Sequence, residues 1–330
     1  MASAGNFRDL SMHGTDSVTG IYLLSGGLFL FSIQDAIIKS FSDDYSLLQI
    51  VFTRSATALI MIFTVMLVTV RPPAFRIHGP WPILIKGSCA FLSYLCYYMA
   101  LTRLPLADAA TIAFSAPIMV TAMSALLFRE RVGWRRWGAV LLGFVAIILV
   151  VGPKGHFSYP AVLLALGAAF AYAVSTIVTR YIDARDTAAT AAFYSMATFL
   201  FWSIVCSLVV FVFWPEEAGG YGPLAFLLRD WKTPSEIDQW LLVLLGLIAT
   251  GGFYCLVKAY MVAEFSAVAP FEYLYILWGA MFGLILWGEI PSVTTMAGIV
   301  LLVTSNLWIF RREMALRTRN AFRRPRIPHR

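Results

Sequence analysis

One segment of the chain constrains its fold more than any other, the apolar run from Asp108 to Phe128. This run contains a single charged residue and one proline, and it ends abruptly at Arg129, Glu130 and Arg131. About 20 helical residues suffice to cross the hydrocarbon core of a bilayer. A soluble helix of this length would carry a charged stripe at helical spacing, and this run carries none. We therefore predict a membrane-spanning helix here.

Nine further runs of similar length and apolarity are spread along the chain. Hydrophobic residues make up 60% of the 330 residues and charged residues 13%, against about 45–50% and about 25% in soluble domains. We therefore expect an all-α integral membrane protein with ten transmembrane helices and no soluble domain. The predicted spans are 19–39, 46–70, 81–102, 108–128, 134–152, 159–180, 188–214, 239–260, 266–287 and 293–311.

The ten spans divide into two related halves. A shift of 159 residues places Ala100 on Ala259 and Glu130 on Glu289. Each copy has small residues, then a long apolar span, a glutamate and another apolar span, and we interpret both glutamates as local structural groups at helix ends. Because each half has an odd number of crossings, the second half must run in the opposite sense. Inverted five-helix repeats are typical of alternating-access carriers, although a duplication that only built a stable bundle would look the same.

The distribution of lysine and arginine predicts the orientation. Most of these residues fall in the connections that share a side with the two termini, and cytoplasmic loops carry the excess of positive charge. We therefore place both termini in the cytoplasm. The expected segments are an N-terminal tail at 1–18, a first repeat at 19–152, a second repeat at 159–311 and a basic tail at 312–330 that meets anionic lipid.

Several kinds of chemistry are not indicated. The net charge of +7 is concentrated in the C-terminal tail, which favours a lipid surface over nucleic acid as its partner. The four cysteines lie in apolar runs without a CxxC pair, and the four histidines lie in predicted loops or tails, so neither residue type predicts a metal site. No P-loop is present. We expect neither a metal nor a cofactor.

Charged side chains inside predicted spans are the strongest markers of a site, because each is costly in a bilayer unless paired or hydrated. Asp35 and Lys39 are spaced to pair on one helix face. Arg54, in the next span, lies at a depth where it could reach Asp35. This cluster is either a clamp between the first two helices or a gate that binds a substrate anion, for which the planar guanidinium is suited.

Glu272 is the second marked position, early in the ninth span and among aromatic residues. A carboxylate in such surroundings suits proton coupling or a hydrogen bond to substrate. Alternatively, it pairs with Lys258 or reaches the nearby interface. Tyr275 and Trp278 lie deeper in the span, where their rings could stack on a planar ligand.

Two further spans contain candidate site residues. Tyr94, Tyr97 and Tyr98 in the third span fit an interfacial aromatic belt better than a site, although we keep Tyr97 as a candidate. Pro117 interrupts the fourth span near its centre and predicts a kink there, because proline removes one backbone hydrogen bond.

Six phrases of the sequence resemble EamA-type members of the drug/metabolite transporter superfamily. They are DAIIK (35–39), QIVFTR (49–54), YYMALTRLPLADAATIAFSAPI (97–118), RERVGWRRWGAVLLGFVAIILVV (129–151), APFEYLYILWG (269–279) and WGEIPSVTTMAGIVLL (287–302). The resemblance implies a ten-helix carrier of the cell inner membrane with cytoplasmic termini. It also implies a central cavity between the repeats, formed by helices 1, 3, 4, 6, 8 and 9 and bordered by Pro117.

We therefore expect a secondary transporter of a small metabolite, driven by a substrate gradient or by protons. DAIIK, QIVFTR and FEYLYILWG are most similar to vitamin and metabolite importers of the superfamily. Aromatic rings around one carboxylate suit a planar, hydrogen-bonding molecule, so riboflavin import is the working hypothesis. The alternative is export of amino acids or other amphipathic metabolites and drugs. An integral-membrane enzyme is the competing class, but the sequence shows no set of polar residues converging at one membrane depth.

Overall fold

The computed structural model describes residues 6–69, 77–127, 134–151, 159–182, 186, 188–213, 223–263 and 269–304, and every regular element in these ranges is a helix. Within these ranges, six helices are long and apolar enough to cross a bilayer. They are α1 (Asn6–Ser40), α2 (Leu47–Thr69), α3 (Pro80–Leu101), α7 (Tyr159–Val178), α8 (Ala188–Phe213) and α10 (Glu236–Val262).

The remaining elements are shorter. α4 (Leu106–Ala113) and α5 (Ala116–Leu127) together occupy the fourth predicted span, and a 3-10 turn, η3 (Ala269–Tyr273), leads into α12 (Leu274–Trp287) in the ninth. The others are α6 (Trp134–Val151), η2 (Thr179–Tyr181), α9 (Pro223–Leu228) and an unlabelled apolar helix, Val293–Thr304. A helical segment therefore lies in each of the ten predicted spans, which confirms the predicted fold class.

Two boundaries differ from the expectation. α1 begins at Asn6, well before the predicted start at residue 19, although its apolar part begins at Val18. The fourth span is also broken into two helices rather than merely bent. Polar residues at the start of α1 carry no hydropathy signal, so the sequence pattern did not predict that helix extension.

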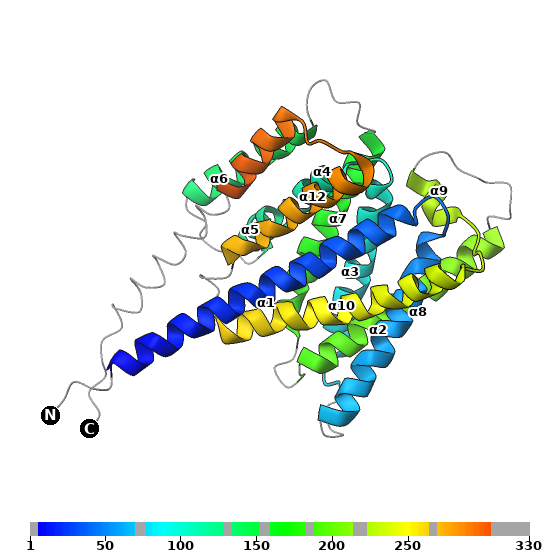
Figure 1. Cartoon of the computed structure of the whole chain (residues 1–330), viewed down its shortest axis with the longest axis horizontal. Coiled ribbons are helices and arrows are strands. Elements are labelled where there is room, and N and C mark those ends of the chain that lie inside the picture. The colour runs from blue at the N-terminus through cyan, green and yellow to red at the C-terminus, as the bar shows by residue number, and fades with distance from the viewer. Residues whose placement is uncertain are drawn as a thin grey trace.

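The packing of the helices has the symmetry expected of two inverted repeats. α1, the first helix of one half, packs along α10, the third of the other, and α3 packs correspondingly along α7. The second helices of the two halves, α2 and α8, pack against each other, as do α4 and α12. Figure 1 shows α1 and α10 side by side along one face of the bundle. The two halves thus meet along most of their length.

The fourth and ninth spans are interrupted at equivalent positions. Phe114 lies at the break between α4 and α5, and the shift of 159 residues places it on Tyr273, the last residue of η3. The rings of these two residues lie 5.7 Å apart, so the axis that relates the halves passes close to them. Discontinuous helices that meet at a repeat interface are typical of substrate sites in transporters. The kink predicted at Pro117 is therefore a break in the helix at residues 114–115, just before the proline.

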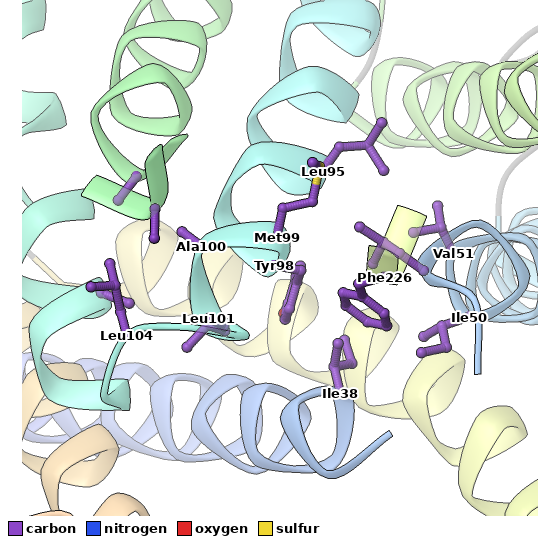
Figure 2. Close-up of a cluster of buried hydrophobic side chains, with 14 of the residues drawn as sticks. Ile38, Ile50, Val51, Leu95, Tyr98, Met99, Ala100, Leu101, Leu104 and Phe226 are labelled. Atoms are coloured by element: carbon purple, nitrogen blue, oxygen red, sulfur yellow. The ribbon is translucent and has the colours of Figure 1, made fainter. Parts of the chain in front are cut away.

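The short helix α9, in the segment before α10, contributes one side chain to the core of the bundle. α9 inserts Phe226, which is 1% exposed, into the main apolar core. Figure 2 shows Phe226 with Tyr98, Ile38 and Ile50 around it. The residues between α9 and α10 are held against α2 by Gln49. Its side-chain amide donates a hydrogen bond of 2.6 Å to the backbone oxygen of Lys232 and accepts one of 3.1 Å from the backbone N–H of the same residue.

The contact between α2 and α10 depends on a glycine. A Cβ atom at Gly246 would lie 2.5 Å from the Cβ of Thr57 and 2.9 Å from the backbone oxygen of Arg54. We predict that Gly246→Ala destabilises the protein by about 1–3 kcal/mol, because overpacking outweighs the gain in helix propensity. Gly167→Ala in α7 is the matched control, since nothing lies within 4 Å of the Cβ position there. Unfolding in detergent measures both changes, and equal shifts in the same direction would refute the packing argument.

Candidate functional site

The candidate site is centred on the carboxylate of Asp35, in α1. Asp35 is 4% exposed. Its Oδ1 atom accepts a hydrogen bond of 2.6 Å from the hydroxyl of Tyr98, and its Oδ2 atom accepts bonds from Tyr97, at 3.0 Å, and from Tyr275. The hydroxyls of Tyr97 and Tyr275 lie 3.2 Å apart. Because α1 and α3 belong to one repeat and α12 to the other, both halves of the protein hold this carboxylate.

A chain of hydrogen bonds connects Asp35 to Arg54. The Nε atom of Arg54 donates to the Oε1 atom of Gln34 at 3.0 Å, and the Nε2 atom of Gln34 donates to the hydroxyl of Tyr98 at 2.9 Å. Tyr98 then donates to Asp35. Hydrogen bonds in such a chain polarise one another in a medium of low dielectric constant. The positive charge of Arg54 is thus connected to Asp35 without direct contact.

The ion pairs that the sequence suggested, Asp35 with Lys39 and Asp35 with Arg54, do not form. Lys39 does not pair with Asp35 but with Glu289, at the end of α12. Arg54 is linked to Asp35 by hydrogen bonds through Gln34 and Tyr98 and not by a direct ion pair. Within the described residues, no cation lies within ion-pair distance of Asp35. The choice between a clamp and a gate for Asp35 and Arg54 stays open.

Aromatic rings surround the polar groups. The guanidinium carbon of Arg54 lies 4.7 Å from the centre of the Tyr94 ring, and that ring packs against Tyr98 at 4.3 Å between centroids. Tyr98 is 2% exposed, so its assignment to an interfacial belt is wrong. Trp278, one turn after Tyr275, meets the ring of Phe29 edge-on at 5.0 Å.

The other candidates lie apart from this cluster. Glu272 is half-buried in η3, one turn before Tyr275, within electrostatic range of Tyr172 of α7 rather than bonded to Asp35. The ring of Pro117 is exposed at the start of α5. Glu130, interpreted from the sequence as a structural residue, lies outside the described residues. The roles of Glu272 and Pro117 in a site stay predictions.

Two residues that complete the network were not among the candidates. Gln34 and Tyr98 each join two other members of the chain from Arg54 to Asp35. An amide next to an aspartate inside an apolar span was the available signal for Gln34. For Tyr98, helical spacing between adjacent tyrosines does not say which one points inward until the neighbouring helices are known.

This arrangement can receive a polar group of a small molecule. An isolated charge inside a membrane costs several kcal/mol unless it is compensated, and Asp35 has hydroxyl donors but no ion pair in the described part of the chain. A cation, a hydrogen-bond donor or a proton could therefore replace one hydroxyl at the carboxylate. Among the described residues, no group of three or more metal-ligating side chains is present.

A bundle of apolar helices in two inverted repeats, with a buried carboxylate held between them, defines a multi-pass membrane carrier. The chain belongs to the EamA-like transporter family, whose model matches residues 18–152 and 159–311. It is therefore a small-molecule transporter of the drug/metabolite transporter superfamily, as the resemblance in the sequence implied.

Named relatives and a solved structure are similar over most of the chain. The pseudopaline exporter CntI of Pseudomonas aeruginosa is 28% identical over 87% of this chain and 94% of that protein. The S-adenosylmethionine uptake transporter of Rickettsia prowazekii is 23% identical over 73% and 75% of the two chains. A crystal structure matches with a TM-score of 0.58 and 18% identity, over 89% of this chain and 98% of that chain. At this identity it supports the fold alone.

The hydroxyl of Tyr98 forms two hydrogen bonds in the chain from Arg54 to Asp35, one with Gln34 and one with Asp35. We predict that Tyr98→Phe destabilises the protein by about 1–3 kcal/mol, because it leaves Asp35 Oδ1 and the Gln34 amide without their partner in a buried place. Tyr94→Phe is the matched control, since it keeps the ring beside Arg54 and removes a hydroxyl that forms no bond to Asp35. Thermal unfolding of both variants in detergent measures the difference. An equal loss in both would mean that the bonds of Tyr98 to Asp35 and Gln34 contribute no more than an ordinary buried hydroxyl.

Proposed function

We propose that the chain is a secondary carrier of the cell inner membrane that moves a small metabolite by alternating access, with Asp35 as the centre of its substrate site. One observation carries the proposal. The Asp35 carboxylate accepts hydrogen bonds from Tyr97 and Tyr98 of one repeat and from Tyr275 of the other. A substrate that binds there contacts both moving halves.

The physical chemistry of a buried carboxylate couples binding to movement. When the repeats move apart, Tyr275 leaves Asp35, and the carboxylate loses one of its donors. Water or substrate must then replace that donor, because an unsatisfied buried carboxylate is strongly unfavourable. In the closed state, either the substrate or Tyr275 completes the site. A closed state in which neither substrate nor Tyr275 donates to Asp35 is therefore unfavourable.

The groups around Asp35 support a proposal for the class of substrate. The aromatic rings of Tyr94, Tyr97, Tyr275 and Trp278 support a planar molecule such as riboflavin, a hypothesis that rests, in the sequence, on the aromatic residues around Glu272. The named relatives point to other substrates, among them S-adenosylmethionine, which combines a planar base with positive charge. Because Asp35 has no ion-pair partner among the described residues, a positively charged group is favoured. We therefore propose import of a planar, cofactor-like metabolite, with S-adenosylmethionine and riboflavin as the two compounds to test.

Export of an amino acid or another amphipathic metabolite is the second candidate. A zwitterion would place its amine at Asp35 and its carboxylate near Arg54. The similarity to the pseudopaline exporter favours keeping this direction of transport open. Vesicles of both orientations, loaded with the test compound, distinguish import from export.

Orientation and coupling complete the proposal. Both termini are proposed to lie in the cytoplasm, from the distribution of lysine and arginine, with the basic C-terminal tail against anionic lipid. A proton is the proposed coupling ion, with Glu272 as one candidate carboxylate. The assignment of 19–152 and 159–311 to the two repeats is part of the same proposal.

Uptake of labelled S-adenosylmethionine and riboflavin into cells that express the chain tests the site. We predict that Asp35→Asn lowers uptake of the transported compound by about 10- to 100-fold, the loss of a hydrogen bond to a charged group of about 1.5–3 kcal/mol. Asp44→Asn is the matched control, because Asp44 is an exposed carboxylate in the turn after α1. Equal uptake by Asp35→Asn and the control, at equal membrane abundance, would remove Asp35 from the site.

Three further variants test whether Glu272, Tyr275 and Arg54 take part in transport. Glu272→Gln and Tyr275→Ala are expected to lower uptake without lowering the amount of protein in the membrane. Unchanged uptake in both would remove the ninth span from the site. Arg54→Ala separates the clamp from the gate, since loss of the protein indicates a clamp, whereas normal protein with lost transport indicates a gate.

A further inference from the structure

A second polar cluster lies at the end of the bundle where α1 and α12 finish. The ammonium of Lys39 pairs with Oε1 of Glu289 and donates to the backbone oxygen of Leu104 at 3.2 Å. It also lies 5.0 Å from the centre of the Trp287 ring. This ion pair joins the last turn of the first helix to the segment that follows α12, and so it fastens one repeat to the other.

The position of Glu289 is fixed by the end of α12. Gly288 adopts a left-handed conformation, with φ of 68°, and the backbone amide of Glu289 then bonds to the oxygen of Gly283 at 3.0 Å. This turn directs the side chain back over the bundle, where Oε2 accepts the backbone N–H of Leu106 at 3.0 Å. Glu289 therefore binds the start of α4 as well as α1: it accepts a backbone amide, as expected of a structural group, but its partners lie on distant helices rather than nearby in the chain.

A third charged side chain, Asp108 of α4, adjoins this pair. Asp108 is 3% exposed, its carboxyl group hydrogen bonds to the side chain of Thr295, and it lies within electrostatic range of Lys39 and Glu289. Thr295 is itself fully buried and bonded to Ser292, 2.9 Å between hydroxyl oxygens. Within the described residues, the Oδ1 atom of Asp108 has no hydrogen-bond partner.

The charges of this cluster do not balance. Lys39 supplies one positive charge and is already engaged by Glu289 and Leu104, while two carboxylates face it. Arg103, in the turn before α4, is exposed. The other charged residues on the described parts of the elements packed against α4 lie at the opposite ends of α3 and α6, and they are Lys86, Arg135 and Arg136. Among the described residues, an ionised Asp108 would therefore be a charge without its own compensating cation and with one oxygen unsatisfied.

We propose that Asp108 is a proton-binding site that controls closure of this end of the bundle. A proton from the adjoining water binds the Asp108 carboxylate while the end is open, which removes the excess negative charge. The Lys39–Glu289 pair then forms and the end closes. Ionised Asp108 opposes closure, because closing would bury its charge beside Glu289 and leave Oδ1 without a donor. No other bond is made or broken.

This inference rests on the proposed function, since it assigns the coupling proton of the same carrier to a particular residue. It differs from the assignment to Glu272, which lies toward the other end of α12. If the non-cytoplasmic face is at this end, as the distribution of lysine and arginine predicts, protons enter from outside. Closure after proton binding then favours import driven by the proton gradient.

Distances between spin labels test the proposal without any substrate. The labels are placed at Ser40→Cys and Val293→Cys, two exposed positions beside the cluster. The background is the full chain in lipid nanodiscs, with its four native cysteines replaced. Between about pH 5 and about pH 9, the wild-type background is expected to shift from the short distance to a longer one. Asp108→Asn, a neutral mimic of the protonated acid, is expected to lose this shift and keep the short distance throughout.

The control variants distinguish proton binding at Asp108 from a general effect of pH on the protein. Asp44→Asn, an exposed carboxylate at the same end, is expected to keep the wild-type shift. Lys39→Gln is expected to give the long distance at every pH, and the exchanged pair Lys39→Glu with Glu289→Lys to restore the short one. A pH shift that survives in Asp108→Asn, or no shift in the wild-type background, would overturn the proposal. Loss of transport in Asp35→Asn is measured separately, so failure here leaves the carrier function intact.

Discussion

The hydrogen bonds at the Asp35 carboxylate are the interaction on which the rest of the structure depends. An acid at this depth needs donors, and Tyr97 and Tyr98 from α3 and Tyr275 from α12 supply them. The donors can converge only if α1 packs between helices from both halves, which is the packing observed. The requirement to satisfy one buried charge thus holds together the interface that a carrier must open and close.

The fold was largely predictable because a bilayer imposes simple rules on length and hydropathy. All ten spans, the internal repeat and the interruption near Pro117 follow from such patterns. The insertion of α9 does not, because a short run such as PLAFLL has the same composition whether it lies on a surface or, as with Phe226, in a core. Only the space left between α2 and α3 determines which occurs.

The polar cluster around Asp35 was predictable in some of its members and not in their pairing, and its role as a site stays a prediction. Asp35, Tyr97 and Tyr275 were candidates by charge, depth and residue type. Helical spacing suggested that Asp35 pairs with Lys39, yet Lys39 bonds Glu289, 250 residues away. Spacing along one helix shows which groups could pair on that helix. It does not show whether a long side chain such as that of Lys39 has a better partner on another helix. Gln34 and Tyr98 were missed for the same reason, since their roles exist only once α1, α2 and α3 are assembled.

The most direct test of the central claim is a structure of the purified chain with its transported compound bound. The account predicts that the compound lies against Asp35 and that the hydroxyl of Tyr275 has been displaced from the carboxylate, because substrate and tyrosine compete for the same oxygen. A bound compound located elsewhere, with all three tyrosine hydroxyls still on Asp35, would contradict it. In that case the carboxylate would be a structural tie between the repeats rather than the centre of the transport site.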